Sequence, residues 1–293
     1  MKKTVSFILA ALMLAAMLVG CGSTTSTSTT AAAADTTAAA EIKTVTPGVL
    51  TVATSPDFAP MEFTDPTKQG QDMYVGFDVT LAKYIAESLG LELQIMPMSF
   101  DACQTAVYTG SVPMSISGYS WTEERGENYE ISDYYYAGDN ETEQVILIKK
   151  TDADKYTSAE DFSGVDVGAQ NASLQMNLLT SQLPDANPIT IGDLGVGVLE
   201  LQNGSIEALA VAKGNAEMIL DSNPDLMICS WEFEVAAEYE ANVILITKGE
   251  TALLNVVNEA LAKAYADGLY GTWYEDAVAL AKSENAAEVS VED

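Results

Sequence analysis

The chain has 293 residues, with 43 acidic residues against 13 basic ones, a formal net charge of −30 and no histidine. The lack of histidine excludes a Ser-His-Asp triad and histidine-ligated metal sites. So acidic a chain also argues against nucleic acid or anionic membranes as direct partners, because binding them relies on clustered Lys and Arg. We therefore expect no metal and no cofactor.

The first residues have the pattern of an export signal followed by a lipid attachment site. Lys2 and Lys3 precede an apolar run that is too short and too early for a lasting transmembrane helix. The sequence Leu-Val-Gly-Cys that ends at Cys21 resembles the bacterial lipobox, in which the cysteine is lipidated and becomes the mature N-terminus. We predict a signal peptide over residues 1–20, then a lipidated Cys21 and a flexible Ser/Thr/Ala tether over residues 21–44. This arrangement would hold the protein on the extracytoplasmic face of the cell membrane.

Apolar runs and helical patterns alternate from residue 49 to residue 117. The runs predict strands at residues 49–54, 91–96 and 112–117, and the patterns predict helices at residues 78–89 and 101–108. Asp78 would cap the start of the first helix, since it stands where the helical pattern begins. A β-α-β-α-β order is typical of a parallel sheet flanked by helices.

The same alternation restarts after residue 143 and continues almost to the end. The predicted strands are residues 144–149, 165–169, 188–191, 206–211, 225–230 and 243–247. The predicted helices are residues 173–182, 194–202, 250–266 and 269–281. Two α/β units imply two lobes, and open parallel sheets bind ligands at the carboxyl ends of their strands. Two such lobes facing each other would form a cleft.

Arg125 is the only arginine in the chain. A guanidinium matches a carboxylate through two parallel hydrogen bonds, which an ammonium does not reproduce. Gly118 and Ser120, shortly before it, leave a backbone N–H and a hydroxyl open to a ligand. On these residues alone, an arginine paired at the surface with Glu123, Glu124 or Glu127 is the simpler interpretation.

A family resemblance favours the ligand-binding interpretation. The run S-G-Y-S-W-T-E-E-R, followed by I-S-D-Y-Y, resembles the pattern S-G-M-T-I-T-P-E-R … F-S-x-P-Y of bacterial solute-binding proteins, family 3, the polar amino-acid receptors of ABC importers. G-F-D-V-T-L-A at residues 76–82 is similar to that family's G-F-D-V-D-L-A.

The resemblance covers about residues 47–281 and implies an α/β, two-lobed periplasmic-binding-protein fold of type II. The chain would cross between the lobes at two hinges, near residues 137–142 and 242–245. Lobe one would comprise residues 45–139 and 244–285, lobe two residues 140–243, and residues 286–293 an acidic tail.

The same resemblance implies roles for individual residues in the cleft. Arg125 would bind the ligand carboxylate, assisted by Ser117, Gly118 and Ser120. Phe58, in a segment that resembles the family's D-Y-P-P-F-E-F, would hold the ligand side chain together with Phe100.

In lobe two, Ala172 and Ser173 stand where the family has a Gly-Thr pair that closes over the ligand carboxylate. The family aspartate that takes the ligand ammonium is replaced here by Ala212. Either Glu207 or Asp57 substitutes for it, or the ligand lacks a conventional α-amine. Lys213 could pair with a second ligand carboxylate.

The resemblance predicts a monomeric receptor that delivers an amino acid or related carboxylate to an ABC permease. An exported enzyme of the dehydratase type, with Asp57 or Glu207 as general acid, is the alternative on the same fold, as is a sensory subunit without a transport partner. Cys103 and Cys229 are expected to be buried free thiols, although a disulfide is the other option in an exported protein.

Overall fold

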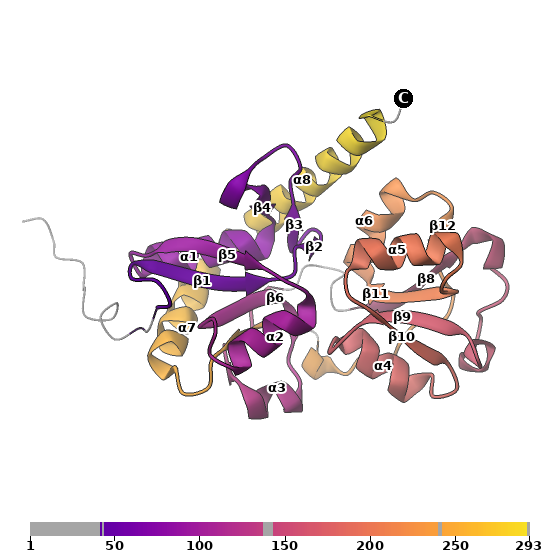
Figure 1. Ribbon diagram of the computed structural model, residues 1–293, viewed down its shortest axis with the longest axis horizontal. Helices are drawn as coiled ribbons and strands as arrows, with labels where there is room; N and C mark the ends of the chain where they lie inside the picture. The colour runs from indigo at the N-terminus through magenta and orange to yellow at the C-terminus, as the bar shows by residue number, and fades with distance from the viewer. Residues whose placement is uncertain (1–41, 43, 137–142, 240–241, 292–293) are drawn as a thin grey trace, which may run out of the picture. The chain divides into compact units, whose positions relative to one another are not determined.

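The structure is a computed structural model that describes residues 42, 44–136, 143–239 and 242–291 (Figure 1). The predicted signal peptide, Cys21, most of the tether and the expected crossing at residues 137–142 lie outside this part. In the described part, no helix is both long enough and apolar enough to cross a lipid bilayer.

The first five-stranded sheet has the strand order β5-β1-β6-β13-β7, of which Figure 1 labels β5, β1 and β6. Its members are β1 (Val49–Thr54), β5 (Glu92–Pro97), β6 (Met114–Ser120), β7 (Glu130–Ile131) and β13 (Asn242–Ile246). β1 is parallel to β5 and β6, whereas β13 is antiparallel to β6 and β7. Two distant parts of the chain therefore build this sheet, and β13 starts within the segment where the second crossing was expected.

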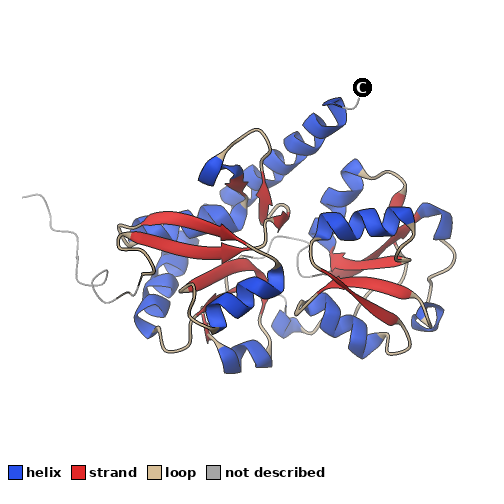
Figure 2. Cartoon of the chain, in the orientation of Figure 1, coloured by secondary structure: helices blue, strands red, loops and turns tan. Residues whose placement is uncertain are grey.

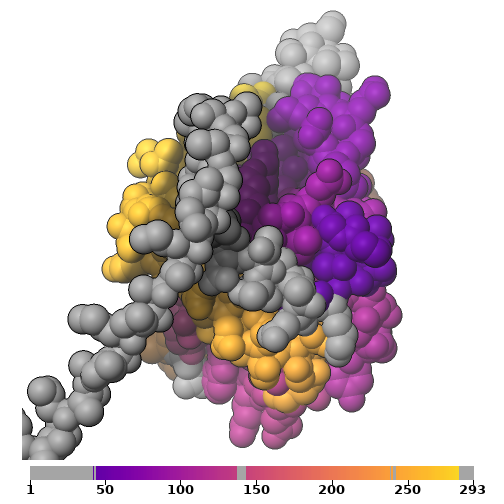
Figure 3. All heavy atoms as spheres, turned by 90° about the vertical axis from the view of Figure 1, so that its left-hand side faces the viewer, coloured from indigo at the N-terminus to yellow at the C-terminus, as the bar shows by residue number. Residues whose placement is uncertain are grey.

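Helices cover both faces of this sheet (Figure 2). The helices are α1 (Phe77–Ser88), α2 (Phe100–Tyr108), α3 (Glu123–Asn128), α7 (Thr251–Ala266) and α8 (Leu269–Val291). In β13, Ile244 and Ile246 join the core formed with α1, α7 and α8, whereas Val243 and Leu245 join the core formed with α2. This alternation follows from the two-residue period of a strand. Helix α1 contacts both α7 and α8, whose orange and yellow residues are visible in Figure 3.

The second sheet has the strand order β10-β9-β11-β8-β12. Its strands are β8 (Gln144–Lys149), β9 (Asp166–Gln170), β10 (Asn187–Ile191), β11 (Ala208–Ala212) and β12 (Leu226–Ile228). β9 is parallel to β10 and β11, and β8 is antiparallel to β11 and β12. Its helices are α4 (Leu174–Gln182), α5 (Leu194–Asn203) and α6 (Lys213–Ser222), with short 3-10 turns η2 (Lys150–Asp152), η3 (Ala159–Phe162) and η4 (Ala237–Tyr239). We call the parts around the first and second sheets lobe one and lobe two.

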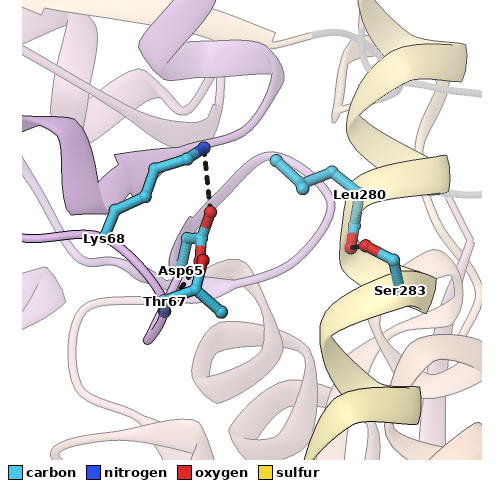
Figure 4. A network of polar contacts seen from close by, with 5 residues as sticks. All are labelled: Asp65, Thr67, Lys68, Leu280 and Ser283. Atoms are coloured by element: carbon cyan, nitrogen blue, oxygen red, sulfur yellow. Dashed lines mark hydrogen bonds and ion pairs between the residues drawn. The ribbon is translucent and has the colours of Figure 1, made fainter.

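A small antiparallel sheet connects β1 to α1. It consists of β2 (Asp57–Phe58), β3 (Glu62–Thr64) and β4 (Tyr74–Val75), with the 3-10 turn η1 (Gly70–Met73) before β4. Asp65 closes the loop after β3 by pairing with Lys68 at 2.8 Å and accepting from the Thr67 N–H (Figure 4). The Lys68 ammonium and Thr67 lower the pKa of Asp65 to about 2. These contacts hold the loop that follows β3 in a defined conformation.

Two sequence predictions need correction, and one helix was missed. Asp78 does not cap α1, because Gly76 takes the cap position and the buried Asp78 carboxylate accepts from the Gly118 N–H and the Tyr135 hydroxyl, each at 2.9 Å. Helix α6 was not predicted. Helix α8 does not end at residue 281 but continues as far as Val291. The expectation for the thiols is confirmed, since Cys103 and Cys229 are both free and buried.

Candidate functional site

A small pocket lies where the carboxyl ends of strands from the two lobes meet. Six of the residues predicted for the site line it, namely Phe58, Phe100, Ser117, Gly118, Ser120 and Arg125. Lobe two contributes residues from β8, β9, β11, α4 and α5. The cavity measures about 30 Å³, room for only a few water molecules. In this conformation the lobes are therefore closed on each other.

Arg125 is the centre of the site. Thr122 caps α3 by accepting from the Arg125 N–H, and the guanidinium turns inward until only 4% of the residue is exposed. Nη1 donates to the Ser120 carbonyl at 2.6 Å, and Nη2 donates across the cleft to the Ala172 carbonyl at 2.9 Å. Nε donates to Gln104 Oε1 at 3.3 Å. All three partners are neutral.

The guanidinium has no carboxylate partner among the described residues, where the ion pairs found involve lysines. Burial lowers the pKa of Arg125 to about 10, although the group stays charged at neutral pH. The guanidinium carbon Cζ lies 5.1 Å from the Tyr119 ring centre and 5.7 Å from the Phe100 ring centre. The π-faces of these two rings therefore partly stabilise the buried positive charge. A buried cation with neutral partners is suited to bind an anion.

Phe58 and Gly118 form one wall of the pocket. Gly118 has φ +58, and a Cβ at this position would lie 3.0 Å from Phe58 Cε1. The ring of Phe58 therefore rests on the bare backbone of β6, which only glycine allows. Phe100 stacks at a tilt on Tyr119, with 4.9 Å between ring centres.

Asp57 is an acidic residue of the pocket lining. Its Oδ2 accepts from the Gln170 side chain at 2.9 Å and from the Leu194 N–H at 2.8 Å, both in lobe two. Burial raises the pKa of the Asp57 carboxyl to about 6, even though these hydrogen bonds favour the charged form. Asp57 is therefore mostly ionised at neutral pH.

Glu62 also lines the pocket, and it forms a buried acid pair with Asp78. The two carboxyl groups interact with each other, and each is 1% exposed. Burial raises the pKa of both, and the pKa of Glu62 is also raised by the charge of Asp78. Asp78 receives donors from Gly118 and Tyr135, whereas Glu62 receives only the Ser117 hydroxyl at 2.7 Å. We assign the proton to Glu62, because these donors favour the ionised form of Asp78.

Three predicted residues of lobe two lie outside the pocket lining. Ala172 has φ +57 and contributes its carbonyl to Arg125, and Ser173 is buried as the cap of α4, accepting from the Met176 N–H. Glu207 is exposed and accepts from the Asp166 N–H at 2.7 Å. Glu207 cannot serve the site, because it precedes β11 and so lies at the amino end of that strand.

Position 212 does reach the pocket, and Lys213 does not. Ala212 lines the cavity as the last residue of β11, with 1% of its surface exposed. Lys213 pairs with Glu143 at 2.6 Å outside the pocket, so the suggested contact with a second ligand carboxylate is absent in this arrangement.

Several site residues were missed, and most of them are neutral amides. Gln104 holds Arg125, while Gln144, Gln170 and Asn242 line the pocket. Their signal in the sequence is weak, because single amides follow no spacing rule. The position of Gln170 and Gln144 at strand ends that face the cleft could have identified them.

Comparison with known proteins places this geometry in a family. Residues 50–277 match the family of bacterial extracellular solute-binding proteins, family 3. The arginine-binding extracellular protein ArtP of Bacillus subtilis is 30% identical over 224 residues, which is 75% of this chain and 82% of ArtP. The L-cystine-binding protein TcyJ of Escherichia coli is 26% identical over 223 residues, 75% of this chain and 79% of TcyJ.

Solved structures give the same result. The amino acid ABC transporter substrate-binding protein AbpA of Streptococcus pneumoniae, bound to L-arginine, has a TM-score of 0.72 and 31% identity, covering 80% of this chain and 96% of AbpA. An ancestral arginine-binding protein bound to glutamine has a TM-score of 0.70 and 30% identity, covering 79% and 98%. The chain therefore belongs to the bacterial extracellular solute-binding proteins of family 3, with their two-lobed type II periplasmic-binding-protein fold, and it is a receptor rather than an enzyme.

Proposed function

We propose that this protein captures an amino acid or a closely related carboxylate between its lobes and delivers it to an ABC permease. The observation that carries the proposal is Arg125, a buried guanidinium in a pocket, held by neutral partners only. A ligand carboxylate would supply the missing counter-charge. The relatives support the ligand class, because those named above are described as binding arginine, cystine or glutamine.

In our proposal, the ligand replaces contacts that the closed lobes make with each other. The Ala172 carbonyl occupies one Nη of Arg125, and the cavity is too small for an amino acid. Binding would therefore require the lobes to separate and to close again around the ligand, a hinge motion that is well known for periplasmic binding proteins. A carboxylate is the stronger partner for Arg125, since hydrogen bonds between two charged groups are about twice as strong as neutral ones.

We assign the remaining contacts as follows. Phe58 and Phe100 hold the body of the ligand, and Ser117, Gly118 and Ser120 border the carboxylate next to Arg125. Ala172 and Ser173 act from lobe two without lining the closed cavity, through the Ala172 carbonyl and the start of α4.

We also propose that Cys21 carries the lipid that anchors the receptor as a monomer at the extracytoplasmic surface, with residues 21–44 as tether. Cys21→Ala should release the protein from the membrane fraction, as measured by fractionation and immunoblotting. An unchanged membrane fraction would contradict the anchor while leaving the binding site unaffected.

The binding proposal is tested by calorimetric titration of the purified protein with L-arginine, L-histidine, L-cystine and L-glutamine. At least one should bind, and Arg125→Ala should weaken that ligand by about a hundredfold or more, equal to about 2.7 kcal/mol. Lys155→Ala is the matched control, because Lys155 is an exposed cation paired with Asp152 outside the pocket. If Arg125→Ala binds as well as Lys155→Ala does, the site is assigned wrongly.

A further inference from the structure

The charges that line the pocket are few and unevenly distributed. Among the described lining residues, Arg125 is the cation, and Asp57 and Glu62 are the acids. Since Glu62 holds a proton beside Asp78, Asp57 is the one lining acid that carries a full negative charge at neutral pH. The pocket thus offers one positive and one negative site.

Both acids belong to lobe one, on the paired strands β2 and β3. The facing wall of lobe two is neutral, since it consists of Ala210, Val211 and Ala212 from β11 with amide side chains beside them. The Gln175 side chain donates to Gln144 Oε1 at 2.6 Å, so these amides are already engaged with each other. The described wall of lobe two therefore has no carboxylate for an ammonium.

The two charged side chains are held by different hydrogen-bond partners. Arg125 is fixed between Ser120 and Ala172, and the ionisable groups that act on its pKa are Tyr119, Tyr129 and Glu124. Asp57 accepts from the first N–H of α5, from Gln170 and from the Ser55 hydroxyl, and it interacts electrostatically with Asp193 and Glu62. The two side chains share none of these hydrogen-bond partners.

An α-amino acid places its ammonium on the same carbon as its carboxylate. With the carboxylate on Arg125, this ammonium would lie beside a buried cation and against a neutral wall. A positive charge farther along the ligand would instead have Asp57, the ionised acid of the pocket lining, as its partner. The charges of the pocket therefore match the distal cation of a ligand and not its α-amine.

We propose that this receptor selects carboxylates with a distal cation, of the ω-amino or ω-guanidino acid class, and that an α-amine adds little to binding. The inference rests on the proposed function and specifies its ligand. Asp57 is the residue that recognises the distal cation, and Ala212 is the position at which recognition of the α-amine is missing.

Three ligands that differ by one group each test this inference by calorimetry. L-Arginine has both cationic groups, 5-guanidinovalerate lacks the α-amine, and L-norvaline lacks the guanidinium. We expect 5-guanidinovalerate to bind within about threefold of L-arginine, and L-norvaline to bind at least about a hundredfold more weakly. If removal of the α-amine costs a hundredfold while removal of the guanidinium costs little, the inference is overturned.

Two variants test which residue recognises the distal cation and which position governs recognition of the α-amine. Asp57→Asn should weaken L-arginine and 5-guanidinovalerate equally, by about thirtyfold or more, and leave L-norvaline unchanged. An equal loss for all three ligands would mean that Asp57 acts only by joining the lobes, which would also overturn the inference. Ala212→Asp adds an acid at the wall, at a helix-cap position that favours aspartate. It should make L-arginine bind at least about tenfold better than 5-guanidinovalerate.

The test separates the two proposals. If no carboxylate or amino acid binds the wild-type protein, the proposed function itself fails. If α-amino acids bind and depend on their α-amine, the proposed function holds and only the inference about the distal cation fails. The comparison of ligands on the wild-type protein decides this even if a variant does not fold.

Discussion

The Asp57 carboxyl makes the stability of this protein depend on pH in a direction opposite to that of most carboxylates. Burial raises its pKa from 3.8 to about 6, so the folded state binds a proton more tightly than the unfolded chain does. The folded protein is therefore more stable against unfolding when Asp57 is protonated than when it is ionised. As pH rises from about 4 through 6, this group lowers the free energy of unfolding, and above that range its contribution is constant.

The size of this effect follows from the shift of about two pKa units, at 1.36 kcal/mol for each unit, which gives about 3 kcal/mol. Asp57→Asn removes the titration. The fall in the free energy of unfolding between pH 4 and pH 7.5 should then be smaller by about 2.5 kcal/mol in this variant than in the wild type, because the unfolded carboxyl is already partly ionised at pH 4. Urea unfolding, followed by tryptophan fluorescence at both pH values, measures the difference.

Asp101→Asn is the control for this experiment. The Ser99 hydroxyl lowers the pKa of Asp101, so this carboxylate contributes stability above its unfolded pKa and loses it as pH falls. Its removal should change the pH dependence in the opposite direction. Equal pH dependence in Asp57→Asn and the wild type would refute the burial and lobe contacts described for Asp57.

Three further predictions concern Glu62 and Gly118, which line the pocket, and Gly76, which caps the start of α1. Glu62→Gln should keep the free energy of unfolding at pH 7 within about 1 kcal/mol in urea titrations, because the amide is neutral like the protonated acid and its oxygen can still accept from Ser117; a loss of several kcal/mol would contradict the proton assigned to Glu62. Gly118→Ala should weaken ligand binding at least about tenfold in calorimetry, because its Cβ would contact the Phe58 ring at 3.0 Å, whereas Gly126→Ala, 3.8 Å from Trp121, should bind normally. Gly76→Ala should lower the free energy of unfolding by about 3 kcal/mol or more, since its Cβ would lie 2.3 Å from the Met61 carbonyl oxygen, while Gly271→Ala in open space should be neutral or stabilising in the same denaturation assay.

The sequence predicted the regular elements of both sheets well, because buried strands read as continuous apolar runs. The strands over residues 49–54 and 144–149 begin and end where they were expected. Helix α6 was missed because Gly214 and Asn215 interrupt its first turn with poor helix formers. The strands β2, β3 and β4 are only two or three residues long, too short to show any period.

The site could be predicted where a single residue type was distinctive. Arg125 was found because it is unique and lies in a recognisable motif, and the structure places it in the pocket. Glu207 was chosen for its charge and its nearness to Ala212 in the sequence, but the direction of β11 sends these two positions to opposite ends of the strand. The proton assigned to Glu62 depends on the interaction between Glu62 in β3 and Asp78 in α1, which no local pattern reveals.

Because Arg125 is the only arginine in the chain and lines the pocket between the lobes, its chemical reactivity can report whether the pocket is open or occupied. Reagents such as phenylglyoxal modify guanidinium groups selectively, so in this chain they have a single target of that kind. Because Arg125 is only 4% exposed in the closed form, modification should proceed only while the lobes stand apart. The rate of labelling at one residue, read by mass spectrometry, then reports how often the receptor opens, and protection by added solute reports binding without any engineered probe.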